Sequence, residues 1–242
     1  MKKKIFTLAV IVALIALMVS GTLAYFTAED KVENSFTIGS VLIEIYENGK
    51  ETISDTLKLD QRLVPIVNTE APNQDDGYIP KVVKVQSTGV NAAYIRTHIA
   101  IPTALVDYLV LDVDTENGWK QVAVSTAVKD GLAYTVYTYD YTDKVEPNAF
   151  TADLLKGVYL ASTVDIKDDP ATESADLVFC KPNGDGTYTF SGFVAHNKVT
   201  GGYSTATVNV LVFSQAIQAQ GFQNGATSAL DAGFGQGTNP WQ

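Results

Sequence analysis

Two histidines, His98 and His196, are the side chains best suited to catalysis, and they lie far apart in the sequence. A catalytic zinc ion usually takes three protein ligands, commonly His with Asp or Glu, and a helical H-E-x-x-H pair is its most recognisable pattern. Neither histidine lies in such a pattern. We therefore interpret both as structural, with His98 exposed on a strand and His196 in a turn.

Acidic side chains alternate in the segment 112–118, which offers oxygen ligands at Asp112, Asp114 and Glu116. An EF-hand calcium loop has Gly at its sixth position and a bidentate Glu at its twelfth. Here Gly118 is at the seventh position and Ala123 at the twelfth, so the EF-hand match fails. We expect no resident cofactor; a looser calcium site at the three acidic residues stays open beside the simpler interpretation, a solvated hairpin loop.

The sequence offers no clear nucleophile. It has no G-x-S-x-G motif, and its single cysteine, Cys180, ends the strand-like run "DLVFC". We interpret Cys180 as a small buried hydrophobic residue. The glycine-rich segment "GFGQG" (233–237) has neither the preceding strand nor the following helix of a phosphate-binding loop. The residues therefore do not predict an enzyme.

The elements that would position any site are mostly strands. Period-two alternation of apolar and polar residues predicts a half-buried strand, and an Asn-Gly pair after such a run predicts a tight turn. Weak helical patterns occur at 104–108, 151–160 and 226–235. The predicted strands lie within the ranges 36–47 (before Asn48-Gly49), 78–89, 92–102, 119–126, 132–142, 176–195 (a hairpin) and 205–222.

About eight to ten strands without regular intervening helices favour an all-β antiparallel sandwich over a parallel α/β sheet. One predicted strand is rich in tyrosine, at Tyr134, Tyr137, Tyr139 and Tyr141. These tyrosines either form a binding face or simply cover a sheet with residues that favour β structure.

The N-terminus has the three parts of a secretory signal peptide. Three lysines (2–4) precede an uncharged apolar run (5–19), and Thr22-Leu23-Ala24 provides small residues at positions −3 and −1 of a cut after Ala24. The apolar run is shorter than the roughly 20 residues of a spanning helix. We predict that residues 1–24 are removed and that Tyr25 begins the mature protein; the alternative is an uncleaved N-terminal anchor.

The charge of the chain excludes some partners. The formal net charge is −10, and removal of the three N-terminal lysines makes it more negative by three. Such an acidic chain does not bind nucleic acid or an anionic membrane through bulk electrostatics. We expect contact with the membrane only transiently, through the signal peptide.

The segment "GTLAYFTAEDKVENSFTIGSVLIEI" (21–45) resembles the N-terminus of the TasA/camelysin family of secreted Gram-positive proteins. A second stretch, "VQSTGVNAAYIRTHIAI" (85–101), resembles a strand–turn–strand landmark of the family, and residues 210–235 resemble its C-terminal strand. Together the matching segments cover about a third of the chain. Beyond the cleavage site, the residues that match are Asn34, Phe36, Gly39, Tyr94 and Arg96.

The resemblance implies a jelly-roll β-sandwich, processing by a SipW-type signal peptidase, and a role in extracellular fibres of a Gram-positive biofilm matrix. Camelysin gives some members a metallopeptidase classification, which we do not transfer because no zinc motif is present. The family's usual Pro-Gly after the first strand is also missing, and "LVPIVNTEAPNQDDG" (63–77) stands in its place.

We therefore expect one β-sandwich domain over residues 36–242, preceded by a mobile segment, 25–35, that adds to a neighbouring copy as a donor strand. This segment combines the apolar residues Tyr25, Phe26 and Val32 with polar ones such as Thr27. An added strand is held mainly by backbone hydrogen bonds and so tolerates polar side chains. The chain itself would be the partner. The alternatives are a secreted camelysin-like metallopeptidase and a monomeric cell-surface binding module.

Overall fold

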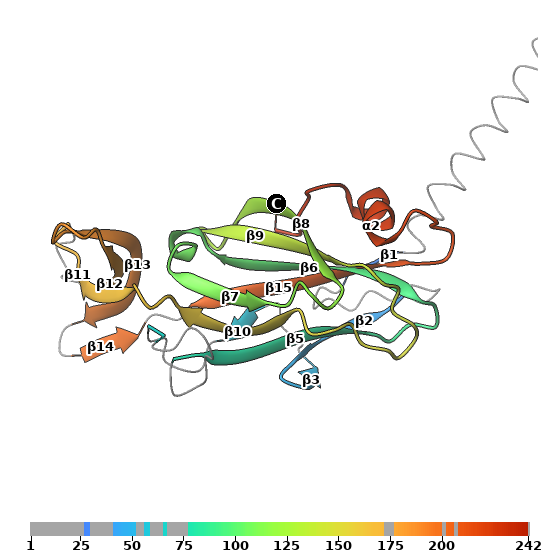
Figure 1. The fold of residues 1–242 in the computed structure, drawn as a ribbon, viewed down its shortest axis with the longest axis horizontal. Helices are drawn as coiled ribbons and strands as arrows, with labels where there is room; N and C mark the ends of the chain where they lie inside the picture. Colours follow the sequence, from blue (N-terminus) through green and yellow to red (C-terminus); the bar gives the residue numbers. More distant parts are fainter. Residues whose placement is uncertain are drawn as a thin grey trace, which may run out of the picture.

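The computed structural model describes residues 27–29, 41–51, 56–58, 65–66, 77–171, 177–199, 202–205 and 208–241. They form three antiparallel sheets and one α-helix (Figure 1). The all-β antiparallel sandwich expected from the strand pattern is confirmed, whereas the jelly-roll connectivity stays a prediction. Within the described ranges, no helix combines the length and the apolar character needed to cross a membrane.

Sheet A has six strands in the order β1-β15-β6-β9-β8, with β4 also paired to β15. Its long strands are those predicted from alternation, because each carries one face for the sandwich core and one for the opposite side of the sheet. The strands are β1 (Thr27–Glu29), β4 (Thr56–Lys58), β6 (Ala93–Pro102), β8 (Trp119–Lys129), β9 (Leu132–Tyr141) and β15 (Asn209–Gln218).

Sheet B has five strands in the order β3-β2-β5-β10-β7. The turn between β2 and β3 is the predicted Asn48-Gly49, and both residues adopt positive φ, as a tight hairpin turn requires. The strands are β2 (Ile43–Glu47), β3 (Lys50–Glu51), β5 (Ile79–Ser87), β7 (Leu109–Val113) and β10 (Leu155–Leu160).

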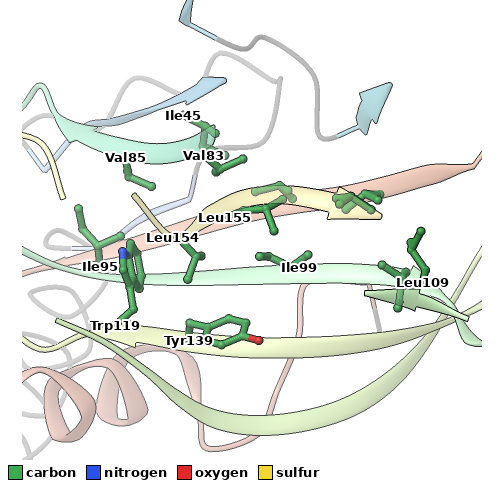
Figure 2. Close-up of a cluster of buried hydrophobic side chains, with 14 of the residues drawn as sticks. Ile45, Val83, Val85, Ile95, Ile99, Leu109, Trp119, Tyr139, Leu154 and Leu155 are labelled. Atoms are coloured by element: carbon green, nitrogen blue, oxygen red, sulfur yellow. The ribbon is translucent and has the colours of Figure 1, made fainter. Parts of the chain in front are cut away.

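The main hydrophobic core lies between sheets A and B (Figure 2). Ile45, Val83 and Val85 come from sheet B, and they face Ile95 and Ile99 of sheet A. All five side chains are buried. Two sheets whose inner faces interdigitate in this way form a β-sandwich.

Between β10 and β15 the chain forms a separate small sheet, sheet C, in the order β11-β12-β13-β14. It lies at one end of the sandwich (Figure 1). The hairpin predicted over 176–195 is confirmed here, and Cys180 is buried within it, as expected. The strands are β11 (Asp165–Asp168), β12 (Leu177–Pro182), β13 (Tyr188–Val199) and β14 (Gly202–Thr205).

The C-terminal part of the chain covers the outer face of sheet A. The weak helical pattern at 226–235 forms helix α2 (Ala226–Phe234), whose C-cap is Gly235 and which buries Ala229 and Leu230 against Ile217 of β15. Further along, Trp241 packs against the second face of β6, β9 and β15. Strands β6 and β15 of sheet A are therefore almost entirely buried on both faces, although the outer face carries several polar residues.

One local expectation needs correction. Residues 151–160, expected to be helical, contain strand β10, because Leu155, Val158 and Leu160 are buried in the sandwich core. The single turn expected at 104–108 is present and begins with a short 3-10 helix, η2 (Thr103–Leu105).

Candidate functional site: the β15 edge of sheet A

Strand β15 is the place where the two ends of the chain meet in sheet A. On one side it pairs with β6 over eight residues, from Leu211 with Ala100 to Gln218 with Ala93. Its other side carries two short strands from the N-terminal part of the chain, β1 and β4. The β15 edge is therefore completed by segments from far away in the sequence, a contact that alternation patterns cannot reveal.

Strand β1 pairs with the C-terminal half of β15, with Thr27 opposite Ile217, Ala28 opposite Ala216 and Glu29 opposite Gln215. Strand β4 pairs with the N-terminal half, from Leu211 to Asn209. Among the described residues, no strand pairs with Val212–Ser214 on this side of β15. The edge is thus only partly covered, by two three-residue strands.

The candidate donor residues have mixed outcomes. Thr27 lies in β1 and pairs within its own chain, so this part of the expected free segment has a partner strand in the structure. Other expected positions lie outside the described residues: Ala24 and Tyr25 of the cleavage site, Phe26 and Val32 of the donor segment, and Asn34, Phe36 and Gly39 of the family motif.

The side chains of β15 are held firmly in place. Positions 210–218 are all buried, and Ser214 and Gln215 have partners across the strand pair with β6. The hydroxyls of Ser214 and Thr97 lie 2.8 Å apart, and Gln215 Oε1 lies 3.1 Å from His98 Nε2. Because buried polar groups are costly without partners, these contacts specify the register of β15 on β6.

Arg96, one of the residues on which the family resemblance is based, anchors the C-terminal helix to sheet A. Its guanidinium contacts both carboxylate oxygens of Asp140 at 2.7 and 3.1 Å. It also donates to Asp231 of α2 at 2.6 Å and to the Gly235 carbonyl at 3.1 Å. Burial opposes the charge of Arg96, but hydrogen bonds to Asp140 and then Asp231 outweigh it and raise its pKa. Tyr94, the second motif residue, packs against the cluster that includes α2.

His98 is buried, which corrects the expectation of an exposed strand histidine. Its ring nitrogens lie 3.0 Å from Thr138 Oγ1 and 3.1 Å from Gln215 Oε1, and Trp241 lies edge-on to the ring. Burial lowers the pKa of His98 to about 4, so the imidazole is neutral near pH 7. His196 lies in β13 rather than in a turn.

The calcium candidates have protein partners. Asp112 accepts a hydrogen bond from the Tyr78 hydroxyl at 2.8 Å, whereas Asp114 lies 2.9 Å from the Lys156 ammonium. Hydrogen bonds from Lys156 and Asn117 lower the pKa of Asp114 to about 2. Glu116 donates its backbone N–H to Asp114. In the described part of the chain, no group of three or more His, Cys, Asp or Glu side chains is placed to hold a metal ion.

The tyrosines of β9 do not form one face. Tyr137, Tyr139 and Tyr141 contact the sandwich core, while Tyr134 lies in the cluster beneath Trp241 on the other side of the sheet. Sequence reasoning missed Asp140, Asp231 and Trp241, although Asp140 carried one signal. A charged residue within a predicted strand suggests a buried ion pair, because Asp is almost never fully buried unless it is paired.

Comparison with known proteins gives no relative: neither a protein-family model, nor a curated protein, nor a solved structure matches the chain.

Proposed function

We propose that this chain is a secreted structural subunit of extracellular fibres, of the kind found in the matrix of Gram-positive biofilms. Subunits assemble when the N-terminal segment of one copy, released by signal-peptide cleavage, completes the β15 edge of the next copy. Such β-augmentation supplies main-chain hydrogen bonds that continue from one subunit to another.

The observation that supports this proposal is the pairing of β1 with β15. Strand β1 lies directly after the predicted cut and before the first long strand, and it contributes only three residue pairs. An element attached at an edge in this way can be exchanged between identical copies, since the same contacts form in trans. Reciprocal exchange gives a closed dimer, whereas head-to-tail exchange whose rotation does not close gives a filament, and we propose the second.

The weak hydrogen bonding of β1 to β15 is compatible with exchange of β1 between copies. An intramolecular hydrogen bond contributes a net stabilisation of about 0.5–1.5 kcal/mol, so the few bonds of a three-residue strand hold β1 only weakly. In a filament the remainder of segment 25–35 has a neighbour to contact as well. Uncleaved, the segment is tethered to the membrane by residues 1–24, which delays assembly until export.

Deletion of residues 25–35 from the mature protein tests the proposal. We expect a folded monomer that forms no filaments in negative-stain micrographs, because the donor segment is gone. Proline at both Thr27 and Lys31 should act similarly by removing backbone donors. Alanine at the same two positions is the matched control, because it retains both N–H groups and should leave assembly intact. Filaments of unchanged width from the truncated protein would refute donor exchange.

A further inference from the structure

Strand β8 forms the other edge of sheet A, opposite β15 (Figure 1). It is 11 residues long and pairs with β9 on one side. In the described part of the molecule, no strand pairs with its other side. Natural proteins usually keep edge strands short, charged or covered, because a free edge can pair with another chain.

The hairpin geometry shows which backbone groups of β8 point outward. Strands β8 and β9 are joined by the two-residue turn Asp130-Gly131, in which both residues have positive φ, and Lys129 is opposite Leu132. The pair that flanks such a turn exchanges hydrogen bonds, and alternate residues repeat the pattern. The N–H and C=O groups of the intervening residues, Val128, Thr126 and Val124, therefore point away from β9.

One contact agrees with this direction. The side-chain amide of Asn239 in the C-terminal segment donates to Ser125 Oγ at 2.9 Å and reaches the Thr126 carbonyl oxygen at 3.4 Å. The Thr126 carbonyl is thus accessible from outside the β8–β9 pair. A carbonyl oxygen has two lone pairs, so this long contact leaves it able to accept a second hydrogen bond.

The two faces of β8 differ sharply. Ala127 is buried in the Trp241 cluster and Ser125 bonds to Asn239, so their face is covered by the C-terminal segment. On the opposite face Val124 is 55% exposed and Val128 is 67% exposed. The first residue of β9, Leu132, is 38% exposed. Leu132 is opposite Lys129 and lies on the covered face, so two of the six exposed large hydrophobic residues in the described part of the structure, Val124 and Val128, share the exposed face of β8.

We propose that β8 pairs with β8 of a second copy, antiparallel about a two-fold axis through Thr126. This register places Thr126 opposite Thr126 of the partner, and Val124 opposite the partner's Val128. The outward-pointing backbone groups of both strands then face one another, and four valines gather on the exposed face. A two-fold contact requires such self-complementarity.

The pairing extends sheet A across two molecules and uses none of the β15 edge. The two charged residues of β8, Lys120 and Lys129, lie toward its ends, outside the Val124–Val128 stretch. The β-bulge between Gln121 and Ala123 limits regular pairing to the part of β8 that follows it. Donor exchange at β15 and pairing at β8 are therefore independent contacts, and in fibres the β8 contact joins neighbouring filaments side by side.

A disulfide tests the two-fold register in the full mature chain. Cα atoms of a hydrogen-bonded antiparallel pair lie about 5.5 Å apart, which a disulfide spans. We expect Thr126→Cys to give a covalent dimer under mild oxidation. Val90→Cys, at a 74% exposed position outside sheet A, is the control for random collision. Cys180 is buried, so it should stay unreacted in both variants.

Two further variants sharpen the result. Ser125→Cys, one residue away, should cross-link much less, because Ser125 is opposite Ala127 of the partner in this register. Adding Val124→Lys and Val128→Lys to Thr126→Cys should reduce dimer yield to the level of Val90→Cys. Equal cross-linking at positions 90, 125 and 126 would overturn the proposal. Because the readout is a covalent dimer, it does not depend on whether filaments form.

Discussion

Gly157 of β10 lies directly against the ring of Tyr78: a Cβ atom at position 157 would stand 2.2 Å from Tyr78 Cζ. The Tyr78 hydroxyl donates to Asp112 at 2.8 Å, which fixes the ring in this position. Burial and then this hydrogen bond raise the pKa of Tyr78. The absence of a side chain at position 157 thus allows three strands of sheet B to be joined through one tyrosine.

Gly157→Ala should therefore lower the free energy of unfolding by about 1–3 kcal/mol, as overpacking commonly does. The measurement is urea unfolding followed by fluorescence. Tyr78→Ala in the same chain should remove most of the additional cost, because the clashing ring is gone. Equal effects of Gly157→Ala with and without Tyr78 would contradict the steric explanation.

Arg96 should be far more sensitive to mutation than a surface cation. Its side chain is 1% exposed and that of Asp140 is 0% exposed, so Arg96→Met leaves a buried carboxylate without its partner. Loss of one member of a buried ion pair costs about 3–5 kcal/mol. Lys144→Met is the matched control, because Lys144 and its partner Glu146 are 60% and 57% exposed. A similar loss of stability in the two variants would show that burial is not the cause.

His98 should make stability depend on pH. Its pKa is about 4 in the folded protein because of burial, with lesser effects from Gln215, Arg96 and Asp140, whereas an unfolded histidine titrates near 6.5. The unfolded state thus binds more protons between these values, so the contribution of His98 is present above pH 6.5 and is lost as the pH falls toward 4.

At about 1.36 kcal/mol per pH unit, the contribution of His98 to the free energy of unfolding falls by about 2 kcal/mol between pH 7 and pH 5. His98→Gln should abolish this part of the pH dependence of stability, while the other titrating groups contribute to the pH dependence as before. Urea unfolding of both proteins at pH 7, 6 and 5 measures the difference. Parallel pH dependences would show that His98 does not titrate in this way.

Paired cysteines at Ala28 and Ala216 should report whether β1 stays in its own chain. These residues are directly opposite each other in the β1–β15 pair. Oxidation of the monomer should lock β1 in place and prevent filament formation, and reduction should restore it. Oxidation after assembly should instead yield a ladder of covalent oligomers in denaturing electrophoresis.

Only intramolecular bonds in oxidised filaments would contradict exchange of β1. Ala28→Cys alone is the control, since it lacks the second thiol and should assemble without a ladder.

Gly157 illustrates where sequence reasoning reaches its limit. A glycine inside the weak helical pattern at 151–160 disfavours a helix, but local propensity could not reveal a strand. The segment is a strand because the core takes up Leu155, Val158 and Leu160. Tertiary burial overrides weak local preference in such segments.

Local patterns determined the long strands β5, β6, β8, β9 and β15, the Asn48-Gly49 turn, the β12–β13 hairpin and the presence of helix α2. Each of these elements depends on residues that are neighbours in sequence, because side-chain alternation and the backbone φ of turn residues determine local structure directly. Only the tertiary structure decided that β1 lies on β15, that Arg96 joins Asp140 to Asp231, and that His98 is buried under Trp241. These contacts join residues far apart in the chain, and they form because the apolar faces of the strands and α2 must be covered together.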